Sequence, residues 1–272
     1  MTSDEKYPYR PVPPSEIAEA AVRPYGVVHY PETDGQPMGE TETHRDETID
    51  LIQALQHFLR DRDDVYVGGD LFIYYEEGNP RAVVCPDVFV VYGVPKLVER
   101  AGRTEKRRIY KLWEEGRPPT MVVEVTSKST RDEDAVDKRV KYAQLGVEEY
   151  FLYDPLDEYL SPQLQGYRLL GDRYRRIQPA ADGSVPSRTT GLTLVVEGDH
   201  LRLRVTATGE PLLRNDELRA RSAEEAAARR QAEERAAEEA AARRQEAAAR
   251  RQAEERATAL EAELERLRRG PT

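Results

Sequence analysis

The chain has 272 residues, enough for one domain of ordinary size with an appendage or for two small domains. Its 41 Lys and Arg residues against 51 Asp and Glu residues give a formal net charge of -10, a composition typical of cytoplasmic proteins. The sequence has no run of about 18 apolar residues and no apolar segment near its start, so we expect neither a membrane-spanning helix nor a secretory signal.

A change in composition near residue 214 separates two parts of the chain. From Asp216 onward there are 14 acidic and 13 basic residues, a net charge of -1, which leaves -9 of the total of -10 for the first 215 residues. We therefore predict an irregular arm over 1–40, a folded domain over 41–213 and a charged Ala/Glu/Arg helix over 214–272.

In the folded domain, the first helix is predicted over 43–60, where apolar residues recur at helical spacing after Thr43, the expected N-cap. Strands are predicted over 65–75, 82–94 and 120–127, because these β-branched and aromatic runs are bounded by Gly, Pro or Asn.

A second helix is predicted over 131–145, ended by Gly146, and a buried strand follows over 149–154. Further short strands are predicted at 165–170, 174–177, 192–197 and 201–205. This order of elements predicts an α/β domain with a mixed central sheet flanked by helices and a small β extension.

The tail repeats short strings at multiples of seven residues: EEAAARRQ occurs at 224–231 and 238–245, and RQAEERA at 230–236 and 251–257. Ala, Glu and Arg are strong helix formers, which predicts a long helix from 215 to 269. Two interpretations remain open. The helix is either free and stabilised by charge pairs, or it forms a short coiled coil at its end through the seam Ala253, Ala257, Leu260, Leu264 and Leu267.

The residue types limit the kind of metal site. The single cysteine, Cys85, cannot form an internal disulfide or a thiolate site, and the four histidines are scattered. Any metal is therefore expected to have oxygen ligands, which favours Mg²⁺ or Mn²⁺.

Three charged residues stand out because of their positions in the predicted elements. Glu124 lies among valines in a strand that is apolar on both sides, where a carboxylate is costly unless it is paired or binds a cation. Asp87 follows a proline at the start of a strand, and Lys138 lies in the next helix. Each has an ordinary interpretation: a structural salt bridge, a turn and a solvated lysine. Together they could converge for metal-assisted phosphodiester hydrolysis.

Longer strings across 35–210 resemble one family. ETETH, PDVFVVYGV, PPTMVVEVTSKST, DKRVKYAQLGVEEYFLYDP and QLQGYRL are similar to the Uma family of restriction-endonuclease-like proteins, in the PD-(D/E)xK nuclease superfamily. The resemblance implies a restriction-endonuclease-like fold for 41–213. It also implies a DNA endonuclease that hydrolyses phosphodiester bonds with a water activated by Mg²⁺ or Mn²⁺.

The resemblance assigns roles to individual residues. It implies that Asp87 and Glu124 bind the metal with the main-chain carbonyl of Val125. The family's helix lysine, four residues before a tyrosine, corresponds to Lys138 with Tyr142.

The chain departs from the superfamily motif at Thr126, two residues after Glu124, where the motif has a lysine. We therefore take Lys138 as the catalytic lysine, with Lys128 as the alternative. Two accessory candidates lie on the first helix. Glu47 is an additional acid or only a favourable charge near a helix N-terminus, and His44 is a cap or a phosphate contact.

Contact with DNA is expected along a basic segment before the Glu124 strand, through Arg103, Lys106, Arg107, Arg108 and Lys111. The alternative is a solvated connection. The acidic domain opposes DNA binding, and with the missing motif lysine it supports a different function: a catalytically weak nuclease fold that acts as a binding module, with the C-terminal helix as its interaction arm. A homodimer through the nuclease domain or the helix is also expected, and no membrane partner.

Overall fold

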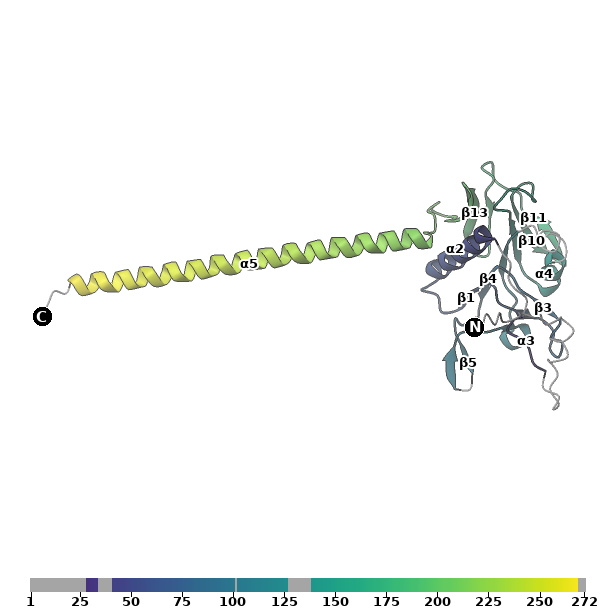
Figure 1. Ribbon diagram of the computed structural model, residues 1–272, viewed down its shortest axis with the longest axis horizontal. Coiled ribbons are helices and arrows are strands. Elements are labelled where there is room, and N and C mark those ends of the chain that lie inside the picture. The colour runs from purple at the N-terminus through teal and green to yellow at the C-terminus, as the bar shows by residue number, and fades with distance from the viewer. Residues whose placement is uncertain (1–27, 34–40, 101, 127–137, 269–272) are drawn as a thin grey trace, which may run out of the picture. The chain divides into compact units, whose positions relative to one another are not determined.

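The computed structural model describes residues 28–33, 41–100, 102–126 and 138–268 of the chain. The chain divides into two compact units, one ending at Asn215 and the other beginning at Asp216. The first unit contains the strands and the shorter helices, and a long helix, α5 (Asn215–Arg268), begins at the end of the first unit and forms the described part of the second, as Figure 1 shows.

A six-stranded mixed sheet forms the centre of the first unit, with the strand order β1-β4-β8-β9-β10-β11. The strands β8 and β9 run parallel, and the other neighbours run antiparallel. The mixed sheet confirms the predicted α/β class. Its strands are β1 (Val65–Gly68), β4 (Val88–Tyr92), β8 (Met121–Val125), β9 (Glu149–Tyr153), β10 (Leu164–Leu170) and β11 (Arg173–Arg176).

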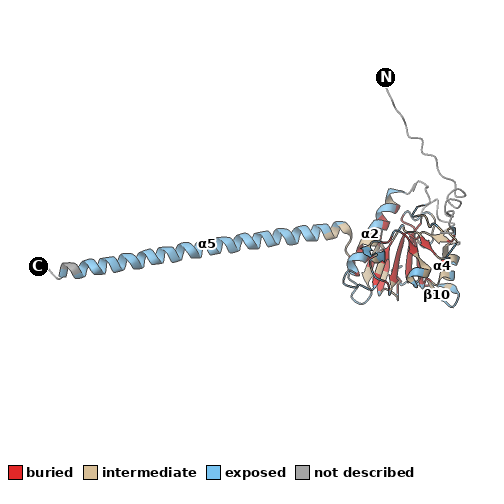
Figure 2. Cartoon of the chain, turned by 90° about the horizontal axis from the view of Figure 1, so that it is seen from below, coloured by how far each residue is buried: buried red, intermediate tan, exposed pale blue. Residues whose placement is uncertain are grey.

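Both faces of the sheet are buried, because successive strand residues point in opposite directions and both sets are apolar. On β4, Val88 belongs to the apolar cluster that contains Leu55 of α2 (Glu42–Phe58). The next residue, Phe89, belongs to the cluster on the other face, which is covered by α4 (Arg139–Leu145). Figure 2 shows the buried strands between the two helices.

Smaller elements complete the unit. A three-stranded sheet has the order β12-β13-β14, another has the order β3-β2-β7, and β5 pairs with β6. Their bounds are β2 (Ile73–Tyr74), β3 (Val83–Val84), β5 (Val98–Arg100), β6 (Arg103–Glu105), β7 (Tyr110–Lys111), α3 (Leu112–Glu115), β12 (Val185–Pro186), β13 (Leu192–Glu197) and β14 (His200–Val205).

The strands differ from the sequence prediction in two respects. The predicted runs 65–75 and 82–94 each break into two strands, at a Gly-Gly-Asp and at a Cys-Pro sequence, since proline cannot donate to a strand ladder and glycine weakens one. The strands β10 and β11, predicted to lie in a β extension, complete the central sheet, because β10 pairs antiparallel with β9.

The helix ends follow capping rules with one shift. The N-cap of α2 is Thr41 and not Thr43, because the Thr41 hydroxyl accepts a hydrogen bond from the His44 N–H at 3.2 Å. Gly146 ends α4 with φ 81°, as predicted. The first part of the predicted helix 131–145 lies outside the described residues.

The helix predicted for the tail is confirmed. It spans 54 residues, and its described side chains are exposed from Arg219 onward. Figure 2 shows this exposure along α5. Of the predicted seam, Leu260 and Leu264 are 61% and 55% exposed. Arginine-glutamate pairs four residues apart link successive turns, for example Arg221 with Glu225 at 3.0 Å. None of the described helices has the length and apolar character that a membrane crossing requires.

Removal of residues 216–272 is expected to leave the unfolding of the first unit nearly unchanged. The exposed side chains of α5 bury little apolar surface, which is the main source of folding free energy. Urea unfolding followed by the fluorescence of Trp113, the single tryptophan, would test this. A truncated chain without a cooperative transition would contradict the division into two units.

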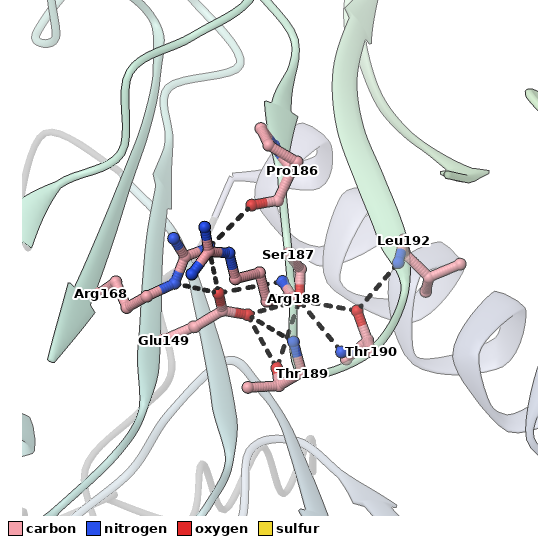
Figure 3. A network of polar contacts seen from close by, with 8 residues as sticks. All are labelled: Glu149, Arg168, Pro186, Ser187, Arg188, Thr189, Thr190 and Leu192. Carbon is pink, nitrogen blue, oxygen red and sulfur yellow. Dashed lines mark hydrogen bonds and ion pairs between the residues drawn. The ribbon is translucent and has the colours of Figure 1, made fainter. Parts of the chain in front are cut away.

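A buried polar network joins the central sheet to the β12–β13 connection (Figure 3). The Glu149 carboxylate accepts hydrogen bonds from Arg168 at 2.7 Å, Ser187 Oγ at 2.6 Å, Thr189 Oγ1 at 2.8 Å and the Arg188 N–H at 3.0 Å. Burial raises the pKa of Glu149, but these hydrogen bonds outweigh burial and leave the pKa below its usual value. The network therefore requires an ionised Glu149.

Candidate active site

Asp87 and Glu124 lie opposite each other at one end of the central sheet. The strands β4 and β8 pair antiparallel with Val88 opposite Val123, and one further step in this register brings Asp87 opposite Glu124. The Asp87 N–H lies 3.4 Å from Glu124 Oε2. Directly opposed residues have Cβ atoms about 4.5–5.5 Å apart, and like charges at such positions repel. The pair therefore requires a compensating cation.

Lys138, the N-cap of α4, and Tyr142 within the helix bind the Glu124 carboxylate, one at each oxygen. Lys138 Nζ lies 3.0 Å from Oε2, and the Tyr142 hydroxyl donates to Oε1 at 2.6 Å. Residues four apart lie on the same face of a helix, which is why both reach one carboxylate. Glu124 is fully buried, whereas the Lys138 side chain is 13% exposed. Lys138 supplies the compensating positive charge, and its side chain is partly exposed to solvent.

The Asp87 carboxylate is held by the backbone and by α2. Its Oδ2 accepts a hydrogen bond from the Val125 N–H at 2.7 Å and lies 3.2 Å from His44 Nε2. Burial raises the pKa of Asp87, but the hydrogen bond from His44, the charges of Lys138 and His44, and the Val125 N–H together lower the pKa below its usual value. Asp87 is therefore a carboxylate at neutral pH.

Tyr142 is a permanent hydrogen-bond donor. Burial raises its pKa well above the usual value, and the charge of Glu124 raises it further. The hydroxyl keeps its proton over the whole physiological range, so it can always donate to Glu124.

A Gly-Gly-Asp turn beside the site was not identified from the sequence. A Cβ on Gly69 would lie 2.2 Å from the Asp87 carbonyl oxygen, so only glycine allows this close approach. Asp70 has φ 48° and donates its N–H to the Pro86 carbonyl at 3.1 Å. Gly68 and Gly69, inside the predicted strand 65–75, were the sequence signal that could have indicated this turn.

The single cysteine, Cys85, also lies near the site. Burial raises the pKa of the Cys85 thiol to about 12, which makes the thiol unreactive.

The accessory residues fall into two groups. His44 lies at the site through its contact with Asp87. Glu47 faces a different direction, because its carboxylate accepts the Leu201 N–H at 3.0 Å and contacts His200, both on β14. Lys128 lies outside the described residues.

The predicted DNA-binding segment uses several of its cations for internal contacts. The Arg107 guanidinium is buried and pairs with Glu115 at 2.7 Å. It also donates to the Pro95 carbonyl at 2.8 Å. Two other cations, Arg108 and Lys111, pair with glutamates. Arg103 and Lys106 are exposed, and within the described ranges neither makes an ion pair.

The ligand atoms at this site indicate which metal ion it suits. Within the described part of the chain, no three His, Cys, Asp or Glu side chains form a group that could hold a metal ion. Mg²⁺ usually needs only one or two carboxylates, since waters and substrate phosphates complete its shell. Asp87 and Glu124 provide carboxylates, and Val125, whose N–H donates to Asp87 at 2.7 Å, would add a main-chain carbonyl oxygen. The donor chemistry fits Mg²⁺ or Mn²⁺.

The chain is similar to proteins of one known family. The sequence profile of a family described as "Uma2: Putative restriction endonuclease" matches residues 29–203. A crystal structure titled as that of a "putative nuclease belonging to DUF820" from Anabaena variabilis has 16% sequence identity and a TM-score of 0.41, with 58% of this chain and 80% of that chain covered. No curated protein matches the chain.

Proposed function

Because the chain belongs to the Uma2 family, described as "Putative restriction endonuclease", we propose that it is a metal-dependent endonuclease that hydrolyses the phosphodiester bonds of DNA. The observation that carries the proposal is the convergence of three groups from separate elements. Asp87 and Glu124 lie opposite each other, and the Lys138 ammonium contacts Glu124 at 3.0 Å. A buried pair of carboxylates next to a lysine suits metal-assisted hydrolysis better than it suits stability.

Each residue has a distinct role in this proposal. Asp87, Glu124 and the Val125 carbonyl would hold the metal ion, which when bound polarises a phosphate and lowers the pKa of a coordinated water. Lys138 stabilises the negative charge that develops on the phosphate. Tyr142 fixes the orientation of Glu124, so that this carboxylate need not reorganise during the reaction.

One observation favours the alternative of a binding module with little or no catalysis. Both oxygens of Glu124 already accept protein hydrogen bonds, and the residue is 0% exposed. A metal would have to share these oxygens with Lys138 and Tyr142. Under this alternative the Lys138–Glu124 pair is a structural salt bridge, and DNA binding does not depend on Mg²⁺.

We expect the full chain to nick supercoiled plasmid DNA in Mg²⁺ or Mn²⁺ and to leave it intact in EDTA, because the opposed carboxylates supply the metal ligands. Agarose gels of relaxed and linear products measure the rate. The Asp87→Asn variant, which keeps the shape of the side chain, is the matched negative control against a contaminating nuclease. Intact plasmid with every metal and at low salt would favour the binding module.

A homodimer would let two sites cut both strands of a duplex, and we propose that α5 contributes to it through exposed Leu260 and Leu264. Light scattering on the full chain should then give twice the chain mass, and Leu260→Glu with Leu264→Glu should return it to a monomer. A monomeric full chain would contradict this proposal.

A further inference from the structure

The helix α4 presents two more cations beside Lys138, one on each side of it. Successive helix residues are rotated by about 100°, so Arg139 and Lys141 flank the row formed by Lys138 and Tyr142. The Arg139 guanidinium lies 5.1 Å from the ring centre of Tyr167 on β10. The Lys141 ammonium lies 4.7 Å from the ring centre of Tyr75, which follows β2.

Within the described ranges, these two cations make no ion pair with an acidic side chain. Among the described residues, neither Arg139 nor Lys141 forms an ion pair with a carboxylate, unlike Arg107, Arg108 and Lys111 of the predicted DNA-binding segment. Among the described residues no carboxylate neutralises their charges, although the first 215 residues carry a net charge of -9. Cation–π contacts orient both side chains without neutralising them.

Both side chains are also partly ordered before any ligand binds. Each has intermediate exposure, as do Tyr75 and Tyr167. The charged group of each side chain lies over a ring, which restricts its motion and lowers the side-chain entropy lost on binding an anion. Within the described residues, the exposed cation Arg103 makes no ring contact of this kind.

We propose that Arg139 and Lys141 form the surface that holds the DNA backbone on the two sides of the phosphate at Lys138. The proposal rests on the proposed function for the choice of DNA as the polyanion. The backbone then crosses α4 between Tyr75 and Tyr167, and the segment 103–111 contributes less than its composition suggests. Phosphate contacts of this kind position the substrate without reading its sequence.

The test measures DNA binding without cleavage. Fluorescence anisotropy of a labelled duplex in EDTA, over a series of KCl concentrations, gives the slope of log K against log salt. The Arg139→Gln, Lys141→Gln double variant should reduce the magnitude of this slope by about 1.8, because each lost phosphate contact removes about 0.9. The Arg173→Gln, Arg175→Gln double variant removes the same charge from exposed positions on β11. Its slope should match that of the wild type.

The control residues, Arg173 and Arg175, lie on the face of the central sheet opposite the one that α4 covers. On β11, Tyr174 packs near Tyr150 on the side covered by α4, and Arg173 and Arg175 alternate with it. If both double variants reduce the salt slope equally, the effect comes from net charge alone and the proposal is overturned. An unchanged slope for the α4 variant, or a larger loss for Arg103→Gln with Lys106→Gln, would also overturn it.

Plasmid nicking by the wild type in Mg²⁺, measured in parallel, separates this inference from the proposed function. If the wild type nicks DNA while the α4 variant keeps the wild-type salt slope, Arg139 and Lys141 do not form the DNA-binding surface, and the nuclease function stands. If the wild type binds DNA with the expected loss in the α4 variant but nicks nothing, the surface stands and catalysis fails.

Discussion

The Glu124→Gln variant is expected to nick plasmid DNA about 10³-fold more slowly than the wild type, a loss at the upper end of that caused by removing one preorganised electrostatic group. Glutamine keeps the size of the side chain and one oxygen, but it removes the charge that attracts a metal ion and holds Lys138 at 3.0 Å. Single-turnover nicking rates in saturating Mg²⁺ provide the measurement.

Two further measurements make this expectation specific to the site. Mn²⁺ affinity, measured by electron paramagnetic resonance of the free ion, should fall in Glu124→Gln, and this readout does not depend on turnover. Glu158→Gln removes the same charge from an exposed residue outside the site and should behave as the wild type. Lys138→Met should slow nicking by about 10²-fold with less effect on Mn²⁺ affinity. Unchanged nicking in Glu124→Gln would remove this carboxylate from the mechanism.

The Glu149→Gln variant is expected to lower the free energy of unfolding by about 3 kcal/mol, the lower end of the cost of breaking a buried ion pair from one side. Glu149 is fully buried, and an amide in its place cannot accept hydrogen bonds at both positions. Arg168 would lose its charge partner, and the hydroxyl and N–H donors of the β12–β13 connection would lose an acceptor (Figure 3). Urea unfolding followed by Trp113 fluorescence measures the difference.

The same network has a defined pH dependence. Hydrogen bonds lower the pKa of Glu149 in the folded chain below that of the unfolded chain, which is about 4.3. The stabilisation is therefore fully present above pH of about 4.3 and is lost as pH falls through the lower, folded pKa. The stability of Glu149→Gln should depend less on pH in this acidic range. The exposed neighbour Glu148→Gln is the control, and equal acid sensitivity in the wild type and Glu149→Gln would contradict the assignment.

Several features of the fold follow from local patterns. Apolar periodicity predicts α2 and the strands, Gly146 ends α4 as its lack of a side chain allows, and the composition of the tail predicts α5. The long strings that resemble the Uma family also identify the family that the profile match assigns to the chain. These properties depend on residues close together in the sequence, so no knowledge of distant contacts is needed to infer them.

The candidate site depends on contacts that local patterns do not contain. Strand register decides that Asp87 faces Glu124, and the packing of α2 against β14 decides that Glu47 faces Leu201. The pairing of buried Arg107 with Glu115, eight residues further along the chain, depends on how the segment between them folds. A basic residue looks the same in the sequence whether its charge is free or paired.

The sequence alone determined the kind of elements, their approximate limits, the helical tail and the residue types able to bind a hard cation. Only the tertiary structure decided which strands are neighbours and which cations lack acidic partners among the described residues. It also decided that Lys138 contacts one oxygen of Glu124 and Tyr142 the other. The physical reason is that hydrophobic periodicity is a property of one segment, whereas charge compensation and strand pairing are properties of segments that meet only when the chain folds.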